Sequence, residues 1–271
     1  MSRPKIFDCI TFFNENLLAN ARIEILKDVV DYFLICESKF DHKGIKKNIN
    51  FKLLNHKYKQ KVKHIVLEEN FPNLNEPWKT EEFQREKIIE HLNQAKENDY
   101  IMYSDSDEIP NPEVLRKIDM KHKFGIFMQK FYVYKINLFN NFETPWEGTK
   151  ITRKKYLKTF THLRKKIKAS NLKKSFWKLQ YEKNIEIFIN GGWHFNNLYT
   201  SDIISKKLKT FQHQEFSNER YSSIENIEEK IRKHEDLFDR KHIYKKIEIN
   251  KNNHPEYIIS NLDLFKDFVE K

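Results

Sequence analysis

The sequence predicts an α/β protein with a mainly parallel sheet flanked by helices. Two observations carry this prediction. Short segments rich in β-branched and aromatic residues alternate with segments whose apolar residues recur at helical spacing. The chain of 271 residues, 39% of them hydrophobic, is also long enough to bury one sizeable core. We therefore expect a single domain over residues 1–271.

The first half of the chain supplies the alternating pattern. Strands are expected at KIFDCITFF, VVDYFLICES, KVKHIVLEE and YIMYSDSDE, which begin at residues 5, 29, 61 and 100. A helix is expected over residues 17–27, and another in WKTEEFQREKIIEHLNQAKENDY, where Thr80 is placed to cap the first turn. Sheets built this way gather ligands beyond the carboxyl ends of their strands.

The second half is predicted to add strands and then helices. FGIFMQKFYVYKINLF, which begins at residue 124, has too many aromatic residues for a surface segment and predicts one or two strands. Charged sequence with apolar residues at helical spacing fills most of residues 216–271 and predicts a helical tail. Within it, PEYIISNLDLFKDFVEK is expected to form a short strand followed by a terminal helix.

The net charge of +11 is concentrated in one stretch. Residues 148–181 hold 12 Lys and Arg side chains and no acidic residue, so the rest of the chain is close to neutral. A general DNA-binding surface is therefore not indicated, and the sequence contains no zinc-finger spacing, so we expect no nucleic-acid partner. The basic stretch could contact a phosphate-bearing substrate, an anionic membrane face, or only water.

Other classes of protein are excluded by what the chain lacks. Its five glycines form neither a G-x-G-x-x-G dinucleotide fingerprint nor a phosphate-binding loop, so any bound diphosphate must be neutralised by other means. No apolar run approaches the roughly 18 residues that cross a bilayer. Cys9 and Cys36 have no metal or redox spacing and are expected to be buried, reduced thiols. We expect a cytoplasmic protein.

The acidic stretch SDSDE follows an apolar strand. Because residues two apart in an extended segment point the same way, Asp105 and Asp107 can face one ligand while Ser106 faces the other side. Mg²⁺ and Mn²⁺ prefer such oxygen ligands and let substrate phosphate complete their coordination. An acidic turn or a helix cap is the alternative interpretation. The position at the end of a strand favours a divalent-metal site.

Four segments in order resemble glycosyltransferase family 17. These are FFNENLLANARIEILKDVVDYFLICESKFDHKG, SDSDEIP, PWEGT and GGWHF, and the resemblance spans residues 6–215. It implies a GT-A type nucleotide-sugar fold and an inverting transfer that depends on Mn²⁺ or Mg²⁺, with UDP-N-acetylglucosamine as donor. Residues 1–118 would then form a nucleotide-binding half, residues 119–215 an acceptor and metal half, and residues 216–271 the tail.

Under this resemblance, site residues can be assigned to roles. His194, after the paired glycines of GGWHF, is expected to complete a metal site with Asp105 and Asp107. Glu215 is expected to be the catalytic base, with Glu147 and Glu108 as alternatives. Loop caps, core packing or surface charges would explain most of the other candidates equally well. Those candidates are Asn14, Glu15, Glu37, Arg85, Asp105, Arg153 and Arg164 for the donor, and Trp146 and Glu147 for the acceptor.

The expected function is therefore transfer of N-acetylglucosamine to a saccharide or lipid-linked saccharide, in bacterial surface glycan synthesis. The enzyme would be cytoplasmic, with a possible peripheral contact at the inner membrane face. The alternative is a non-catalytic carbohydrate- or nucleic-acid-binding protein that uses the basic segment 150–178. A phosphatase that forms an aspartyl phosphate is disfavoured, because its acidic pair would follow the first strand rather than the fourth.

Overall fold

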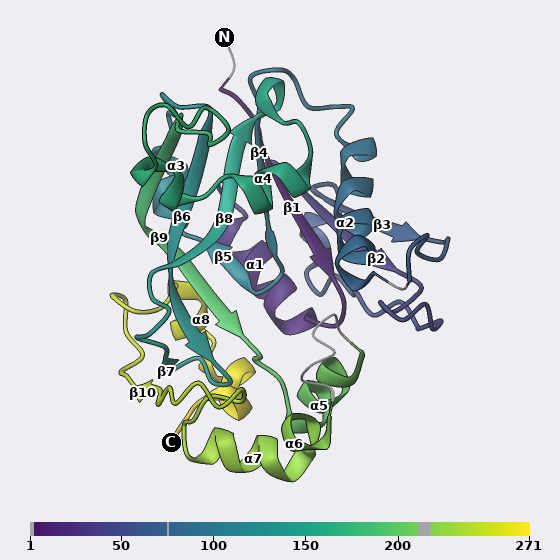
Figure 1. The fold of residues 1–271 in the computed structure, drawn as a ribbon, viewed down its shortest axis with the longest axis vertical. Helices are drawn as coiled ribbons and strands as arrows, with labels where there is room; N and C mark the ends of the chain where they lie inside the picture. The colour runs from purple at the N-terminus through teal and green to yellow at the C-terminus, as the bar shows by residue number, and fades with distance from the viewer. Residues whose placement is uncertain (1–2, 75, 211–217) are drawn as a thin grey trace.

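The computed structural model describes residues 3–74, 76–210 and 218–271. Its centre is one ten-stranded sheet with helices on both faces, which confirms the predicted α/β class (Figure 1). One half of the sheet consists of β1 Ile6–Phe12, β2 Tyr32–Ser38, β3 Val62–Leu67 and β4 Tyr100–Asp105. These strands are parallel, as expected, in the order β3-β2-β1-β4. Their carboxyl ends therefore meet at one edge of the sheet.

The other half of the sheet is mixed. It contains β5 Glu108–Pro110, β6 Phe124–Val133, β7 Leu138–Phe139, β8 Trp146–Arg153, β9 Ile185–Asn196 and β10 Lys245–Lys246. β8 runs antiparallel to both of its neighbours, β4 and β6, whereas β9 runs parallel to β6. This reversal was not part of the prediction. It brings the first residue of β8, Trp146, to the edge where β4 ends.

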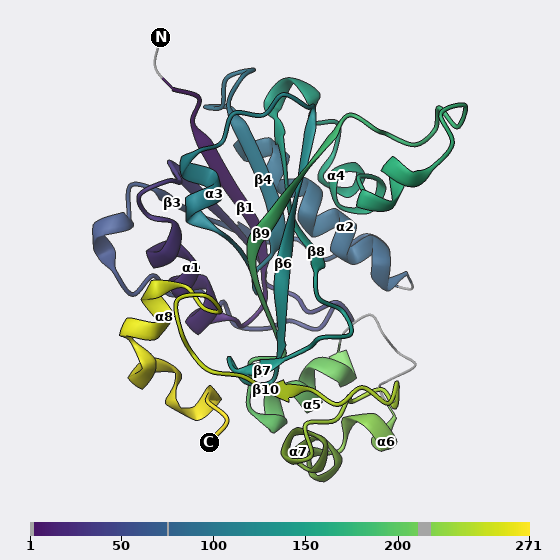
Figure 2. The same ribbon diagram turned by 90° about the vertical axis from the view of Figure 1, so that its left-hand side faces the viewer.

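Apolar residues that alternate along the strands build a core on each face of the sheet. The nearest helices are α1 Asn16–Leu26, α2 Pro77–Lys87, α3 Pro112–Arg116 and α4 Phe160–Lys166. On β1, Ile10 and Phe12 pack on the face that α1 covers, whereas Phe7 and Cys9 pack on the other. Figure 2 shows α1 on one side of the sheet and α2 with α4 on the other. Cys9 and Cys36 are buried free thiols, as expected.

The helix α2 begins earlier than predicted. Its first residue is Pro77, a residue type favoured at helix starts because its fixed φ suits the first turn. Thr80 is therefore fully buried within the helix, and the prediction that it caps the start is wrong. After Lys87 the chain continues as the 3₁₀ turn Ile88–His91.

The helical tail is confirmed. The described part of residues 216–271 contains α6 Glu219–Ser222, α7 Ile224–Arg232, α8 Glu256–Ser260 and the 3₁₀ segment Leu262–Phe268, and α5 Ser201–Thr210 precedes it. Ile204 and Ile227 pack against Phe131 of β6, which attaches α5 and α7 to the sheet. The short strand expected near the end is wrong, because Pro255 leads into α8, which buries Ile258 in a third apolar cluster. No described helix combines the length and the apolar character needed to cross a membrane.

A buried arginine joins the first helix to three strands. Arg22 of α1 forms two hydrogen bonds of 2.6 Å to the carboxylate of Asp8 on β1, and both side chains are only 1% exposed. It also donates to the hydroxyl of Ser104 on β4 and to the backbone carbonyl of Glu108 on β5. This arginine therefore ties the segment on either side of the SDSDE turn to the centre of the sheet.

Replacing Asp8 by Asn should leave a buried guanidinium without its counter-charge. We expect Asp8→Asn to lower the free energy of unfolding by about 3–5 kcal/mol. Chemical denaturation followed by circular dichroism would measure the loss. The matched control is Glu113→Gln, which removes an exposed ion pair with Arg116 and should change the stability by less than about 1 kcal/mol. Equal effects of the two variants would contradict a structural role for the buried pair.

Candidate functional site

A cavity of about 400 Å³ lies beyond the carboxyl ends of β1 and β4. The segment after β1 contributes Phe13 and Glu15, and the turn after β4 contributes residues 105–107. Trp146 and His194 line the side formed by β8 and β9. In an α/β sheet this edge is where ligands bind, because the loops that follow the strands converge there.

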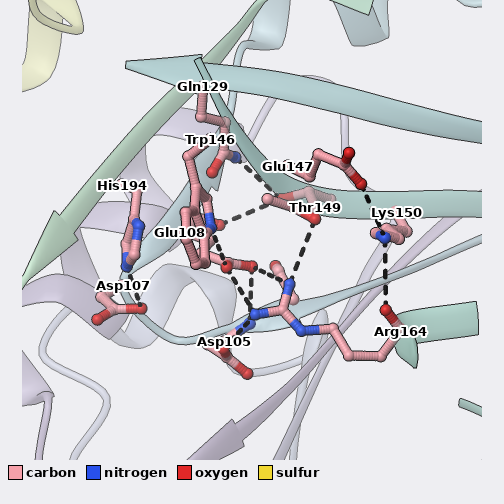
Figure 3. Close-up of polar contacts among 12 residues, drawn as sticks. Asp105, Asp107, Glu108, Gln129, Trp146, Glu147, Thr149, Lys150, Arg164 and His194 are labelled. Atoms are coloured by element: carbon pink, nitrogen blue, oxygen red, sulfur yellow. Dashed lines mark hydrogen bonds and ion pairs between the residues drawn. The ribbon is translucent and has the colours of Figure 1, made fainter. Parts of the chain in front are cut away.

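The two aspartates of the acidic turn both line the cavity but have different partners. Asp105 accepts a hydrogen bond of 2.6 Å from Arg164, and its side chain is 37% exposed. Asp107 lies 3.5 Å from Nε2 of His194, and its side chain is 13% exposed (Figure 3). The turn therefore presents one carboxylate to an arginine and the other to an imidazole. Ser106, expected to face away, also lines the cavity.

Strand pairing sets the contact between Asp107 and His194. β5 runs antiparallel to β9, and Glu108 lies directly opposite His194 in this pair. The backbone N–H of Phe195 also donates to the carbonyl oxygen of Asp107. The imidazole packs against the ring of Phe131, stacked at 4.3 Å, and the ring of Trp146 at 5.1 Å, and these two rings also contact each other at 5.3 Å. These contacts fix both the position and the plane of the histidine ring.

The paired glycines explain how β9 comes so close to β5. Gly192 lies opposite Pro110 and has a φ of +133°, which side chains rarely allow. A Cβ atom there would lie 2.1 Å from the carbonyl oxygen of Ile109. A Cβ atom on Gly191 would lie 2.6 Å from the backbone nitrogen of Met128. Close approach of another backbone therefore accounts for both glycines, and positive φ is a second reason at Gly192.

The electrostatics of the pair favour its charged forms. Burial alone would raise the pKa of Asp107, but the adjacent His194 outweighs burial and lowers it. Burial alone would lower the pKa of His194, but Asp107, followed by Glu108 and Asp105, outweighs burial and raises it. The other ring nitrogen of His194, Nδ1, is buried and has no hydrogen-bond partner among the described residues.

A divalent cation fits this donor set in part. A carboxylate oxygen of Asp107 and the Nε2 atom of His194 are suitable ligands for Mn²⁺, and both line an open cavity. The described residues contain no group of three His, Cys, Asp or Glu side chains that could hold an ion. Asp105, the third expected ligand, is already paired with Arg164. Substrate and water would have to complete the coordination, as is common for such ions.

Glu108 is buried at the centre of the polar network in Figure 3. Its carboxylate accepts hydrogen bonds of 2.7 Å from the indole N–H of Trp146 and of 2.8 and 3.1 Å from Arg164. The backbone N–H of Asp105 completes its partners at 3.2 Å. Because the side chain is fully buried and fully engaged, Glu108 positions the residues around it and is unsuited to be the alternative base.

Arg164 reaches the site from α4. Thr159 caps this helix by accepting from the backbone N–H of His162. Lys150 donates to the carbonyl oxygens of Arg164 and Ile167 at its other end, and burial, then Arg164, lowers the pKa of Lys150 to about 8. Burial opposes the charge on Arg164, but Asp105 and Glu108 outweigh burial and hold its pKa above the usual value. The structure thus places Arg164 beside the cavity, locked between two carboxylates.

The three acidic and amide candidates after β1 and β2 do not share one site. Glu15 lines the cavity, accepting from the backbone N–H groups of Phe13 and Asn14 at 2.9 Å and from the hydroxyl of Tyr199. Asn14 itself lines a neighbouring depression. Glu37 is fully buried and caps the following loop by accepting from Lys47 and from the backbone of residues 50 and 51. Only Glu15 is therefore placed to touch a ligand in this cavity.

The other two arginine candidates, Arg85 and Arg153, lie at very different places. Arg85 is buried in α2, where it contacts the hydroxyl of Tyr103 at 3.0 Å and the carboxylate of Glu81 at 2.5 Å. Only Glu81 of these lines the cavity. Arg153 ends β8 at the opposite edge of the sheet, opposite Tyr100, and its guanidinium lies over that ring. Because β8 runs antiparallel to β4, its last residue cannot reach the cavity, and we do not retain Arg153 as a donor-binding residue.

The acceptor candidates separate in the same way. Trp146 lines the cavity and is oriented by Glu108. The next residue, Glu147, points away, toward Lys150 at 3.7 Å and the backbone N–H of Ala169 at 3.2 Å. Successive strand residues face opposite sides, so the two cannot share one ligand, and we do not retain Glu147. Glu215, the expected base, lies outside the described residues.

Several cavity residues were not anticipated. Lys207 of α5 and Arg240 of the tail add positive charge to the cavity wall, and Glu81 and Glu143 add negative charge. Arg240 is held by Asp236 at 2.5 Å and by Glu143 at 3.2 Å. Lys207, Arg240 and Glu81 lie in strongly charged sequence, where a functional side chain looks like a solvated surface charge, whereas Glu143 lies in a mostly neutral loop. No sequence signal distinguished them.

The comparisons with known proteins identify the family of the chain. A model of glycosyltransferase family 17 matches residues 1–266. No curated protein matches the chain. Among solved structures, a glycosyltransferase involved in the glycosylation of the major capsid of PBCV-1 is 12% identical, with 69% of this chain and 81% of that chain covered and a TM-score of 0.31.

Glucosyl-3-phosphoglycerate synthase from Mycobacterium tuberculosis, in complex with Mn²⁺, UDP and phosphoglyceric acid, is 9% identical, with 95% of this chain and 92% of that chain covered and a TM-score of 0.34. At such TM-scores the structural likenesses carry no argument about this chain. The family model, by contrast, covers nearly the whole sequence. The chain belongs to glycosyltransferase family 17.

Proposed function

We propose that this chain is a metal-dependent inverting glycosyltransferase with a nucleotide-sugar donor and a saccharide or lipid-linked saccharide acceptor. The observation that carries the proposal is the pairing of Asp107 with His194 at 3.5 Å in the cavity beyond the parallel strands. Family membership supports the reaction class. The donor that the family resemblance implies, UDP-N-acetylglucosamine, is the one we propose.

The proposed metal site consists of Asp107 and His194. A divalent cation held there would offset the negative charge that develops on the departing diphosphate. The chain binds the cation through one carboxylate and one imidazole, and the rings of Phe131 and Trp146 keep that imidazole in place. Lys207 and Arg240, which also line the cavity, would bind phosphate oxygens in place of the backbone cradle that a glycine-poor chain lacks.

Asp105 and Trp146 have proposed roles in holding the sugars. Arg164 binds Oδ2 of Asp105, so the partly exposed carboxylate is oriented and can accept a hydrogen bond from a donor hydroxyl in the cavity. Trp146 is oriented by the bond from its indole nitrogen to Glu108, and its ring offers an apolar face to a pyranose. Residues 1–118 would then serve the nucleotide and residues 119–215 the acceptor.

The proposed base is Glu215, on the family pattern alone. An inverting transfer needs a carboxylate that takes the proton of the attacking hydroxyl. The described acids of the cavity are already engaged: Glu15 with two backbone N–H groups, Glu81 with Arg85, and Glu143 with Arg240. A carboxylate outside the described residues is therefore our choice.

Removing the carboxylate of Asp107 should abolish metal-assisted chemistry. We expect Asp107→Asn to reduce Mn²⁺-stimulated hydrolysis of the cognate nucleotide sugar by at least about 100-fold, because a metal site contributes several kcal/mol of charge stabilisation. Hydrolysis of a panel of nucleotide sugars, with and without Mn²⁺, would measure the change. Asp119→Asn, at a side chain 89% exposed and away from the cavity, is the matched control. Unchanged hydrolysis in Asp107→Asn would reject the proposed function.

The assignment of the base can be tested with two glutamates. We expect Glu215→Gln to lower kcat for sugar transfer by about 10²–10⁴-fold while leaving binding of the donor intact, because general base catalysis contributes on that scale. Glu147→Gln should change kcat by less than about threefold, since its carboxylate points away from the cavity. Steady-state kinetics with a saccharide acceptor would separate the two. The opposite ranking would move the base to Glu147.

A further inference from the structure

Residues 172–180, in the sequence LKKSFWKLQ, form a projecting surface loop between α4 and β9 that begins with the last two residues of the 3₁₀ turn Ala169–Lys173. All nine residues are exposed. Three large apolar side chains in this loop face solvent: Phe176 is 74% exposed, Trp177 83% and Leu179 88%. Figure 2 shows this part of the chain extending away from the body beyond α4. Single exposed apolar residues are ordinary, but three within four positions form a patch that needs an explanation.

The loop has a defined conformation. The backbone N–H of Lys178 donates to the carbonyl oxygen of Ser175 at 3.0 Å, which closes a turn around the two aromatic residues. The Nζ atom of Lys183 donates to the same oxygen at 2.6 Å. The rings of Phe176 and Trp177 pack edge to face at 5.4 Å. The apolar side chains are thus displayed by an ordered turn and pack against each other rather than against the core.

Positive charge surrounds this apolar patch. Lys173, Lys174 and Lys178 are exposed within the loop, and Lys166 and Lys168 are exposed just before it. No acidic residue occurs between residues 148 and 181. The Nζ atom of Lys183 lies 5.8 Å from the ring of Phe176. Lysines therefore surround exposed Trp, Phe and Leu side chains. Such a surface is complementary to one that is anionic outside and apolar beneath.

We propose that the loop of residues 172–180 docks this protein on an anionic lipid bilayer. The side chains of Phe176, Trp177 and Leu179 enter the boundary between headgroups and acyl chains, and the lysines contact the anionic headgroups. A protein partner of opposite charge would explain the lysines. It would explain the three large apolar residues at the tip of the turn only if it also offered an apolar groove to receive them. An anionic bilayer accounts for both the lysines and the exposed apolar side chains.

This surface is separate from the proposed catalytic machinery. The loop lies between α4, whose Arg164 binds Asp105, and β9, yet none of residues 172–180 lines the cavity. Docking on a bilayer therefore does not depend on the proposed metal site of Asp107 and His194. If the acceptor is a lipid-linked saccharide, docking holds the cavity at a fixed distance from the bilayer in which the acceptor is anchored.

Vesicle co-sedimentation of the full chain tests the proposal. We expect binding to vesicles of phosphatidylcholine mixed with phosphatidylserine, and little binding to phosphatidylcholine alone or at high salt. The triple variant Phe176→Ser, Trp177→Ser, Leu179→Ser should bind at least about tenfold more weakly, because its apolar insertion is lost. Each of Lys173→Gln, Lys174→Gln and Lys178→Gln should weaken binding roughly fivefold. Ile189→Ser, at a side chain 76% exposed elsewhere, is the matched control and should bind normally.

The fluorescence of Trp177 provides a second readout. On addition of anionic vesicles, the emission of the wild-type protein should shift to the blue, and Trp177→Phe should abolish most of this shift while binding persists. Absence of vesicle binding, or equal binding by the triple variant, would overturn the proposal. So would self-association of the wild type that the triple variant abolishes, or binding to an RNA homopolymer in place of vesicles. Donor hydrolysis should be unaffected in the triple variant, which shows that it folds and separates this test from that of Asp107.

Discussion

The position of the acidic turn depends on one buried guanidinium. Arg22 binds Asp8 on β1, the hydroxyl of Ser104 one residue before Asp105, and the carbonyl of Glu108 one residue after Asp107. The turn is thereby clamped on both sides, while its two aspartates remain free to face the cavity. A buried ion pair contributes little net stability, because desolvation offsets most of its attraction. Its value here lies in the geometry that it enforces, since a charged group has few alternative places in an apolar core.

A second network gives Asp105 and Asp107 different charge partners. Arg164 and Trp146 converge on the buried carboxylate of Glu108, and Arg164 extends to Asp105. Asp105 is thus neutralised by an arginine that the protein supplies, whereas Asp107 lies 3.5 Å from His194, with Lys207 and Arg164 contributing less to its low pKa. Two carboxylates separated by one residue therefore meet different electrostatic environments. One is suited to orient a neutral hydroxyl, the other to attract a cation.

The sequence predicted the parts of this protein whose signal is local. Alternating strands and helices and the end of β4 at the acidic turn follow from residue type and spacing. The direction of β8 could not be predicted, because strands of either direction share the same alternation, and this direction decides that Trp146 reaches the cavity while Arg153 does not. Lys207 and Arg240 escaped notice because their neighbours in sequence are also charged. The sequence offered Glu108 as an alternative base because it does not show that this carboxylate is buried and fully hydrogen-bonded. Those two properties depend on the folded chain.

The glycine pair of β9 has a further meaning for how this site could change. The separation of Asp107 from His194 is set by two backbones in van der Waals contact, at Gly192 and Ile109, rather than by any side chain of the site itself. Even the smallest addition, a methyl group, would push β5 outward and open the gap between carboxylate and imidazole. Both proposed ligands would be retained in such a variant, yet their spacing would no longer suit one shared ion. The proposed metal site would thus be constrained at a position that carries no functional atom.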